Sequence, residues 1–529
     1  MRRLPASAAA LICAALLVSC SGGAAESTAA DTKTDTVETV TEEQTEDNWN
    51  GPEDMGKKYY FSADGSDENS GECESEPWKN LSRLNGTILS AGDKVLLRRG
   101  DVWNERLEIR GKGSEEARIY VGPYGEGDGM PCISLSNSRD DIAVLCEDTT
   151  EGLCYIWIDG IDVRNSTLGV YFRFAKSTEN RGIRVSNCRF TNINCPDLMN
   201  EALTDLSWLG AERAGLDGGG AYEYIWPAAI NVGGRPPLPL SATEIPGVCA
   251  PSCVVSGIEI CDCEFISCVV GVGANCYNYH YGMGENQFRG YTKNWKISRL
   301  RATGTMTVFN FDSCSFGYDG TEQSEYGIFE DIICTGGMEG FTMSAGTTLA
   351  LFSSCCDLYI KNSRFSGCRN NGAPDGCGFD FERDDHNITL DSCVIDNNDG
   401  QGVLVMDTVL YDQVTKTESH TPNTDCAVIN CLFYNNMRNV YNGNYKFDVL
   451  VFNRENENFT VSGNTFYYRR NTSGAASVRI NRSNSNDLPA GAVKKGVICE
   501  NNTLVCRENE SDLPDIDALI EETFGRPYK

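Results

Sequence analysis

The sequence predicts an all-β protein, a right-handed parallel β-helix (a solenoid) with a short helical cap at each end. A short unit recurs along the chain: apolar, any, any, then Cys, Asn or a small residue, any, apolar. From residue 297 onward the unit begins at 297, 329, 360, 390, 428, 461 and 499, in steps of 30 to 38 residues, which is a solenoid period. The unit is too short and too rich in Val, Ile and Phe for a helical repeat, so we expect strands.

Each period also holds a second strand after a turn, and this strand often begins at glycine. Two or three short strands in a coil of about thirty residues are typical of a parallel β-helix, in which each coil bonds to the next about 4.8 Å away. Clear copies of the first unit begin at Val185, Ile260, Ile360, Leu390, Val428 and Val461, and weaker ones at Ile158, Ile297, Phe329 and Cys499. The second strands include Gly169–Phe172, Gly340–Ser344, Gly378–Glu382 and Gly402–Met406.

The N-terminus carries the features of an export signal. Arg2 and Arg3 precede an apolar run, and Leu17-Val-Ser-Cys20 matches a bacterial lipobox. We therefore predict a signal peptide over residues 1–19, lipidation of Cys20, and a lipid anchor in the cell membrane on its extracytoplasmic face. Residues 20–56 hold almost no large apolar side chain, so we expect a disordered acidic tether.

Residues 57–529 carry one repeat pattern, so we expect one β-helix domain, with an insertion loop over about 193–256. An open solenoid end exposes strand edges and needs a cap. Residues 78–90 predict a short helix before the first coil. Near the other end, residues 511–514 predict a helix start, followed on one face by Ile516, Leu519, Ile520 and Phe524.

Charge and cysteine content limit the partners and the chemistry. The formal net charge of −30 argues against nucleic acid, which needs a basic surface. Several of the 25 cysteines occupy one repeat position, so we expect a buried ladder of stacked thiols there: Cys188, Cys263, Cys393 and Cys431. Others could pair as disulfides, such as Cys249, Cys253, Cys355 and Cys356.

Three segments together resemble the N-terminal entry of the pectate-lyase-like superfamily of right-handed parallel β-helix proteins. They are residues 59–71 (YYFSADGSDENSG), 92–103 (GDKVLLRRGDVW) and 119–125 (IYVGPYG). With the repeats, the resemblance covers roughly residues 57–510 and implies a protein that acts on polysaccharides as a lyase, hydrolase or epimerase. The active-site signatures of that superfamily are missing from this chain, so no catalytic residue is carried over.

Outward carboxylates on neighbouring coils are the candidate catalytic residues. In Gly378-Phe-Asp-Phe-Glu382 the aromatic residues should point inward, which turns Asp380 and Glu382 outward. Phe309-Asn-Phe-Asp312 repeats this pattern two coils earlier, which places Asp312 about 10 Å from Glu382, with Thr342 and Ser344 between. Paired carboxylates at such separations are the machinery of glycosidases. A slip of one residue would turn Asp380 inward and remove this site.

Two further groups are candidates. Asp384 and Asp385 could add oxygen ligands for calcium, although no metal site is well defined. Two long loops are aromatic, and aromatic faces on long loops commonly bind sugars. The candidate substrate-binding residues are Tyr224, Trp226, Arg235, Tyr279, His280 and Arg289.

Three functions stay open at this point. The first is a surface-anchored glycoside hydrolase, a monomer that needs no cofactor and acts on a polysaccharide or oligosaccharide. The second is a polysaccharide lyase that acts on a uronate-containing glycan. The third is a glycan-binding β-helix lipoprotein without catalytic activity. All three place a carbohydrate at the protein, and none involves nucleic acid.

Overall fold

The chain divides into two compact units, Met1–Asn50 and Gly51–Lys529. The computed structural model describes residues 55–138, 141–174, 179–195, 227–233, 254–275, 292–312, 314–317, 326–338, 347–370, 376–406, 409–411, 418–420, 422–439, 448–452, 456–469, 478–481, 493–494 and 496–528, all in the second unit. Within these ranges, no helix is long and apolar enough to cross a membrane.

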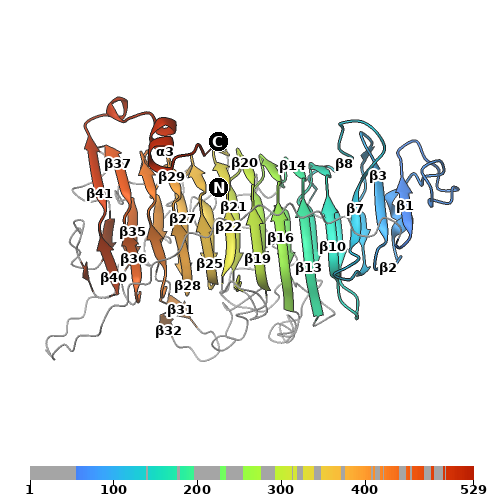
Figure 1. Ribbon diagram of the computed structural model, residues 1–529, viewed down its shortest axis with the longest axis horizontal. Coiled ribbons are helices and arrows are strands. Elements are labelled where there is room, and N and C mark those ends of the chain that lie inside the picture. The colour runs from blue at the N-terminus through green and yellow to red at the C-terminus, as the bar shows by residue number, and fades with distance from the viewer. Residues whose placement is uncertain are drawn as a thin grey trace, which may run out of the picture. The chain divides into compact units, whose positions relative to one another are not determined.

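The second unit confirms the predicted parallel β-helix: three sheets run along it, and successive coils contribute one strand to each (Figure 1). Sheet A contains β1 (Lys58–Phe61), β2 (Leu89–Ser90), β3 (Lys94–Arg98), β6 (Gly111–Lys112), β7 (Ile119–Tyr124), β10 (Cys154–Asp159), β13 (Glu179–Ser186), β16 (Val254–Cys261), β19 (Thr292–Ser298), β22 (Gly327–Glu330), β25 (Cys356–Lys361), β28 (His386–Asp391), β33 (Ala427–Ile429), β36 (Phe459–Ser462), β39 (Val493–Lys494) and β40 (Val497–Glu500).

Sheet B contains β4 (Val102–Trp103), β8 (Cys132–Ser134), β11 (Asp162–Arg164), β14 (Arg189–Thr191), β17 (Glu264–Ile266), β20 (Arg301–Thr303), β23 (Ile333–Thr335), β26 (Arg364–Ser366), β29 (Val394–Asp396), β34 (Leu432–Tyr434), β37 (Thr465–Arg469) and β41 (Thr503–Arg507). Sheet C contains β5 (Leu107–Ile109), β9 (Ile142–Glu147), β12 (Leu168–Arg173), β15 (Ala228–Gly233), β18 (Val270–Asn275), β21 (Thr307–Asp312), β24 (Thr348–Ser353), β27 (Cys377–Arg383), β30 (Val403–Val405), β35 (Val449–Phe452) and β38 (Val478–Asn481). A separate hairpin pairs β31 (Val409–Tyr411) with β32 (Glu418–His420).

The recurring unit is the turn from sheet A to sheet B. Its first and last apolar residues lie in the core, as Val185 and Phe190 do. The residue at its third position has a positive φ in every copy, which lets the chain turn sharply; Asn, Asp and Gly accept this conformation best. These residues are Gly160, Asn187, Asp262, Arg299, Asp331, Asn362, Ser392, Asn430, Gly463 and Asn501.

The fourth position of the unit points inward, and the four predicted thiols are buried there as two pairs on neighbouring coils, Cys188 with Cys263 and Cys393 with Cys431. Leu300, Ile332 and Ser363 take this position in the coils between the pairs, so the ladder is interrupted. The thiols of Cys393 and Cys431 each lie within hydrogen-bond distance of the carbonyl two residues earlier, at 3.3 and 3.1 Å. In a later coil Asn464 takes this position, and its side chain bonds the backbone of the preceding coil at Cys431 and Val428. Burial raises the pKa of the Cys431 thiol well above its usual value. Among the described cysteines, all are free thiols.

Of the two predicted helices, only the C-terminal one forms an α-helix; the segment 78–90 forms a 3-10 turn and the strand β2. Before the first complete coil, the chain forms one 3-10 turn, η1 (Leu81–Leu84), whose leucines enter the core. The C-terminal helix α3 (Ile516–Phe524) follows the short turn η5 (Glu510–Asp512). It packs its apolar face, with Leu519 and Ile520, on the outer face of sheet B (Figure 1) rather than over the last coil. The apolar outer residues of sheet B there are Val394, Leu432 and Tyr434.

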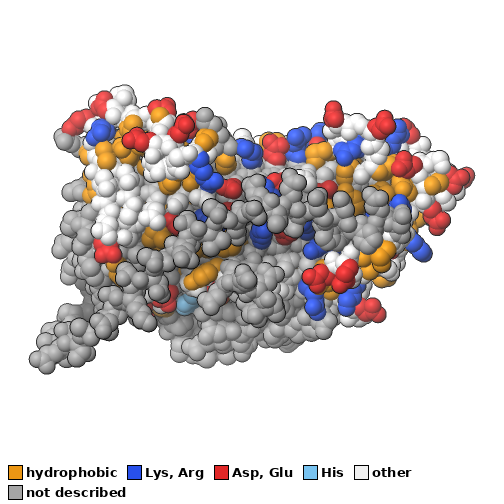
Figure 2. Space-filling model, in the orientation of Figure 1, with side chains coloured by type: hydrophobic (Ala, Val, Ile, Leu, Met, Phe, Trp, Pro, Cys, Tyr) orange, Lys and Arg blue, Asp and Glu red, His pale blue; other side chains and the backbone are white. Residues whose placement is uncertain are grey.

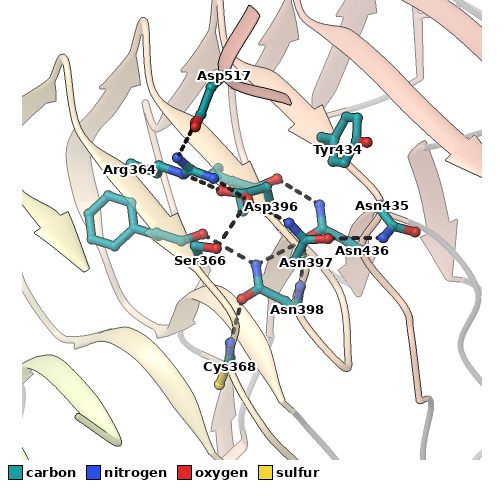
Figure 3. Close-up of polar contacts among 12 residues, drawn as sticks. Arg364, Ser366, Cys368, Asp396, Asn397, Asn398, Tyr434, Asn435, Asn436 and Asp517 are labelled. Carbon is teal, nitrogen blue, oxygen red and sulfur yellow. Dashed lines mark hydrogen bonds and ion pairs between the residues drawn. The ribbon is translucent and has the colours of Figure 1, made fainter. Parts of the chain in front are cut away.

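A polar network joins this helix to the coils beneath it (Figure 3). Asp396 is fully buried and receives two hydrogen bonds of 2.9 Å from the guanidinium of Arg364. Asp517 of α3 contacts the same arginine at 3.1 Å. Behind them, Asn398 and Asn436 form an inward ladder at the turn from sheet B to sheet C. The C-terminal segment therefore ties several coils together from outside.

The outer surface is charged rather than apolar. Acidic and basic side chains are interspersed over the described surface of the N-terminal coils (Figure 2). Ion pairs on the outer strands include Arg189 with Glu264 at 2.8 Å and Lys361 with Glu330 at 3.1 Å. These pairs are half-exposed, so they contribute little stability. The interior, by contrast, is a continuous stack of Phe, Val, Ile, Leu and Cys.

The positive φ at the third position of the turn gives a stability prediction at Asn501, whose side chain is exposed and whose φ is 55°. Asn501→Val should destabilise the last coil by about 1–2 kcal/mol, because a β-branched residue is strained in this conformation. Asn501→Gly should be close to neutral. Urea unfolding followed by hydrogen exchange in β40 and β41 measures both variants; equal stabilities would contradict the account of the turn.

A second stability prediction concerns Asp448, a fully buried residue directly before β35. Burial raises the pKa of Asp448 to about 7, against an opposing effect of the Asn436 side chain. The folded state thus favours the protonated form of Asp448. The contribution of Asp448 to the free energy of unfolding is therefore lost as pH rises from about 4 toward 7. Asp448→Asn should remove this loss, worth up to about 4 kcal/mol at pH 8. Thermal unfolding across pH 5–8 would contradict this if both proteins gave parallel profiles.

Candidate functional site

The outer face of sheet C is where the predicted carboxylates lie. Phe379 and Phe381 of β27 are fully buried in the core, so the alternation places Asp380 on the outer face, as predicted. The side chain of Asp380 is nevertheless only 2 % exposed. Its neighbours in register are Leu351 of β24 and Leu404 of β30. The carboxyl group of Asp380 therefore lies between two apolar side chains.

The register between β24 and β27 shifts immediately after Phe381, which corrects one prediction. Phe352 pairs with Phe381, but the next residue, Ser353, pairs with Arg383. Glu382 is thus the extra residue of a β-bulge, and it is half-buried. Simple alternation had placed Asp312 in the column of Glu382; the bulge places it instead in register with Ser353 and hence with Arg383.

The spacing of the coils sets the distance between Asp312 and the residues of β27. Asp312 lies in β21, two rungs from β27, so roughly 10 Å separates its Cα from that of Arg383. The rung between them is β24, with Leu351 and Ser353 on its outer side, and not the segment with Thr342 and Ser344, which lies outside the described residues. Asp380 and Glu382 share β27, and Asp312 lies two rungs away in β21, in the column of Arg383.

Arg383 is a member of this group that the sequence pattern did not reveal. It is 5 % exposed and lies beside Ser353. The expected alternation assigned position 383 to the interior, and only the bulge turns the arginine into the outer column.

The two candidate calcium ligands point into different environments. Asp384 has a φ of 52° and lies on the outer side of the turn, where its carboxylate is 2.9 Å from Nε2 of His386. His386 contacts the hydroxyl of Thr424 through Nδ1. Asp385 is fully buried. Among the described residues, no group of three or more His, Cys, Asp and Glu side chains could hold a metal ion.

Asp385 belongs to an inward ladder and not to the surface. Its Oδ1 accepts the backbone N–H of Cys355 at 2.9 Å, and its own N–H donates to Asn423 at 2.9 Å. Asn423 in turn donates its N–H to Asn456. Burial, with smaller contributions from Asp384 and Glu382, raises the pKa of Asp385 well above its usual value. Protonated Asp385 therefore occupies the ladder position that Asn423 and Asn456 occupy in the later coils.

Three long connections begin or end at strands of sheet C. Thr191 ends β14 and Ala228 begins β15, Gly233 ends β15 and Val254 begins β16, and Asn275 ends β18 and Thr292 begins β19. The predicted insertion loop over 193–256 thus contains a regular strand of sheet C. All three connections join the ends of sheet C strands, and long connections on a rigid scaffold commonly carry function. The predicted sugar-binding residues Tyr224, Trp226, Arg235, Tyr279, His280 and Arg289 lie outside the described residues, as does Cys20.

Comparison with known proteins adds a similarity to carbohydrate-active β-helix proteins. No family model matches the chain. A curated lacto-N-biosidase of Bifidobacterium longum is 30% identical over 138 residues, which are 22% of this chain and 9% of that protein. The crystal structure of a GH136 lacto-N-biosidase from Eubacterium ramulus has a TM-score of 0.50 at 15% identity, and covers 85% of this chain and 68% of that chain.

The chain shares its fold with that GH136 lacto-N-biosidase. An alginate lyase from a Paenibacillus species is also similar, with a TM-score of 0.37 at 10% identity over 72% of this chain and 90% of that chain. The sequence match spans less than a tenth of the curated relative. The similarity in structure therefore establishes the parallel β-helix, and the residues of sheet C must carry any argument about chemistry.

The inward ladder predicts the behaviour of Asp385→Asn. Since the folded pKa of Asp385 is raised, its stabilising effect in the wild type is lost as pH rises through that pKa. The amide is neutral at every pH and fits the ladder, so the variant should fold and should be the more stable protein at pH 8. Thermal unfolding at pH 5 and pH 8, with calcium and with a chelator, measures this. Calcium that stabilises the wild type but not the variant would instead make Asp385 a metal ligand.

Proposed function

We propose that the chain is a glycoside hydrolase whose active site lies on the outer face of sheet C, with Asp380 and Glu382 as the paired carboxyl groups. The observation that carries the proposal is the placement of Asp380 between Leu351 and Leu404, beside a bulge that presents Glu382. Two carboxyl groups in unlike environments are what an acid and a base at one site require.

The two environments indicate which carboxyl group acts as the acid and which as the nucleophile or base. We assign the acid that protonates the leaving oxygen to Asp380, the more buried of the two residues, which lies in register with Leu351 and Leu404. Glu382 is more exposed, as a nucleophile or a base for water needs to be. The Cα atoms of residues two apart on a strand are roughly 6.5–7 Å apart, and the bulge alters this distance. Asp312, two rungs away in β21, would stabilise positive charge that develops on the sugar.

The substrate class follows from the similarities. The sequence match and the shared fold both involve lacto-N-biosidases, so we propose a glycan that carries lacto-N-biose at the cleaved end. Of the two substrate classes that the sequence left open, polysaccharide and oligosaccharide, we therefore propose an oligosaccharide. Hydrolysis by two carboxyl groups requires no cofactor. Surface anchoring through a lipid on Cys20 stays part of the proposal, as does a monomeric state.

A chromogenic substrate tests the proposal with the chain from residue 52 onward. The wild type should release p-nitrophenol from p-nitrophenyl β-lacto-N-bioside, and Asp380→Asn and Glu382→Gln should each lower kcat by about 10²-fold or more, since each removes one carboxyl group. Asp448→Asn, which changes a buried acid of another coil, is the matched control and should keep full activity at pH 5.

Other outcomes separate the alternatives. A parallel assay on uronate polysaccharides records absorbance near 235 nm, where an unsaturated product absorbs. A gain in absorbance without new reducing ends would favour a lyase. Glycan binding without any turnover would favour a binding protein. Turnover that survives both substitutions would place the active site elsewhere.

A further inference from the structure

The outer face of sheet C has a gap in its row of side chains. One column runs through Tyr171, Asn231, Gly273, Asn310 and Leu351, which pair in register from β12 to β24. Every neighbour of Gly273 in this column has a side chain, and Gly273 has none. The gap is one rung wide and has an asparagine on each side. It lies in β18, a strand at which one of the long connections begins.

Backbone conformation does not require glycine at this position. Gly273 has no positive φ, and it lies within a regular parallel strand. A Cβ atom built there would be 3.2 Å from Oδ1 of Asn231 and 3.6 Å from a methyl of Val270. A small shift of the asparagine would admit it. Glycine in a strand interior usually marks a close approach by another group, and here the space is on the outer side of the sheet.

The side chain of Asn231 borders this gap, and the backbone carbonyl oxygen of Asn310 lies 3.7 Å from a Cβ atom built at Gly273. Asn231 is only 6 % exposed, and its carbonyl oxygen is the nearest atom to the gap. Asn310 is half-buried. Within the described part of the chain, no hydrogen bond engages either amide. Neither amide is among the buried polar atoms that lack a partner, so both keep some contact with solvent and are available to an occupant that donates and accepts hydrogen bonds.

The chemistry of the gap suits an uncharged, hydroxyl-bearing group. An amide offers both donors and an acceptor, which is what sugar hydroxyl and acetamido groups need. In this column, the residues from Tyr171 to Leu351 carry no formal charge. A uronate would lack a cationic partner among them. The gap therefore discriminates in favour of a neutral sugar.

We propose that Asn231, Gly273 and Asn310 form a binding subsite for one uncharged sugar unit of the substrate. The subsite rests on the proposed function and deepens it, since it lies in the same outer column of sheet C as Asp380. Gly273 is three rungs from Asp380, roughly 14 Å, so the sugar bound there is not the one that is cleaved. The asparagines bind substrate and set specificity, and they take no part in the chemistry.

Filling the gap tests the subsite. Gly273→Trp should raise KM for a neutral oligosaccharide at least tenfold and change kcat less than twofold, because it removes binding common to the ground state and transition state. Asn231→Ala and Asn310→Ala should each weaken binding about three- to tenfold, the loss of one or two hydrogen bonds. Thr303→Trp adds the same bulk to an exposed position of sheet B and is the matched control, with no expected change.

Direct binding keeps this test independent of catalysis. In an Asp380→Asn background, isothermal calorimetry compares lacto-N-tetraose, which is neutral, with trigalacturonic acid, which is anionic. We expect the protein to bind the neutral probe and not the anionic one. Gly273→Trp should abolish this binding, and Gly273→Ala should weaken it without abolishing it. Thermal unfolding confirms that each variant is folded.

Each result decides between the two proposals. If Gly273→Trp abolishes binding of the neutral probe while the wild type shows no turnover, the subsite is kept and the proposed hydrolysis is overturned. Neutral binding unaffected by Gly273→Trp, tighter binding of the anionic probe, or no binding of the neutral probe would each overturn the subsite.

Discussion

The architecture depends on one backbone constraint, the left-handed residue in each turn from sheet A to sheet B. With φ near 55° at that residue, the chain changes direction within two positions and leaves the following side chain pointing inward. In some coils the residue at that inward position bonds the backbone groups of the turn, and in others Ile161, Leu300 or Ile332 fills it with an apolar side chain. The bonding residue is a thiol in some coils and an asparagine in others, as Cys431 and Asn464 illustrate. The fixed turn keeps every coil in register, and the register creates the columns on the outer faces.

Chemistry on such a scaffold is assembled from columns, with one outward residue per coil. Sheet B shows the structural use of a column, where apolar side chains accept helix α3 and Arg364 pairs with Asp396 beneath it. Sheet C shows the other use. Its outer columns contain amides, carboxylates and a glycine gap, and its strand ends carry long connections. The regular turns hold these columns rigid, while the bulge at Glu382 departs from regularity at the place where two carboxyl groups come together.

The sequence predicted the features that repeat. The period located the coils, the repeated cysteine position predicted the buried thiols, and the alternation at Phe379 and Phe381 placed Asp380 outside. Features that break the repeat were missed, because they depend on contacts between coils. The bulge moved Asp312 into the column of Arg383, and the register of the turn carried Asp385 into the interior. The C-terminal helix was found from its apolar face, but that pattern could not indicate which surface it covers. The gap at Gly273 needed the pairing of three strands before it could be recognised, although the alternation in β15 already turned Asn231 outward.

The central claim is that the outer face of sheet C binds and cleaves a neutral glycan. A crystal structure of the Asp380→Asn protein with lacto-N-tetraose tests it most directly. The account predicts that the sugar lies along β15 to β27, with the scissile oxygen at residue 380 and a distal unit against Gly273. A glycan bound on sheet A or sheet B, or on sheet C away from Glu382, would contradict the account.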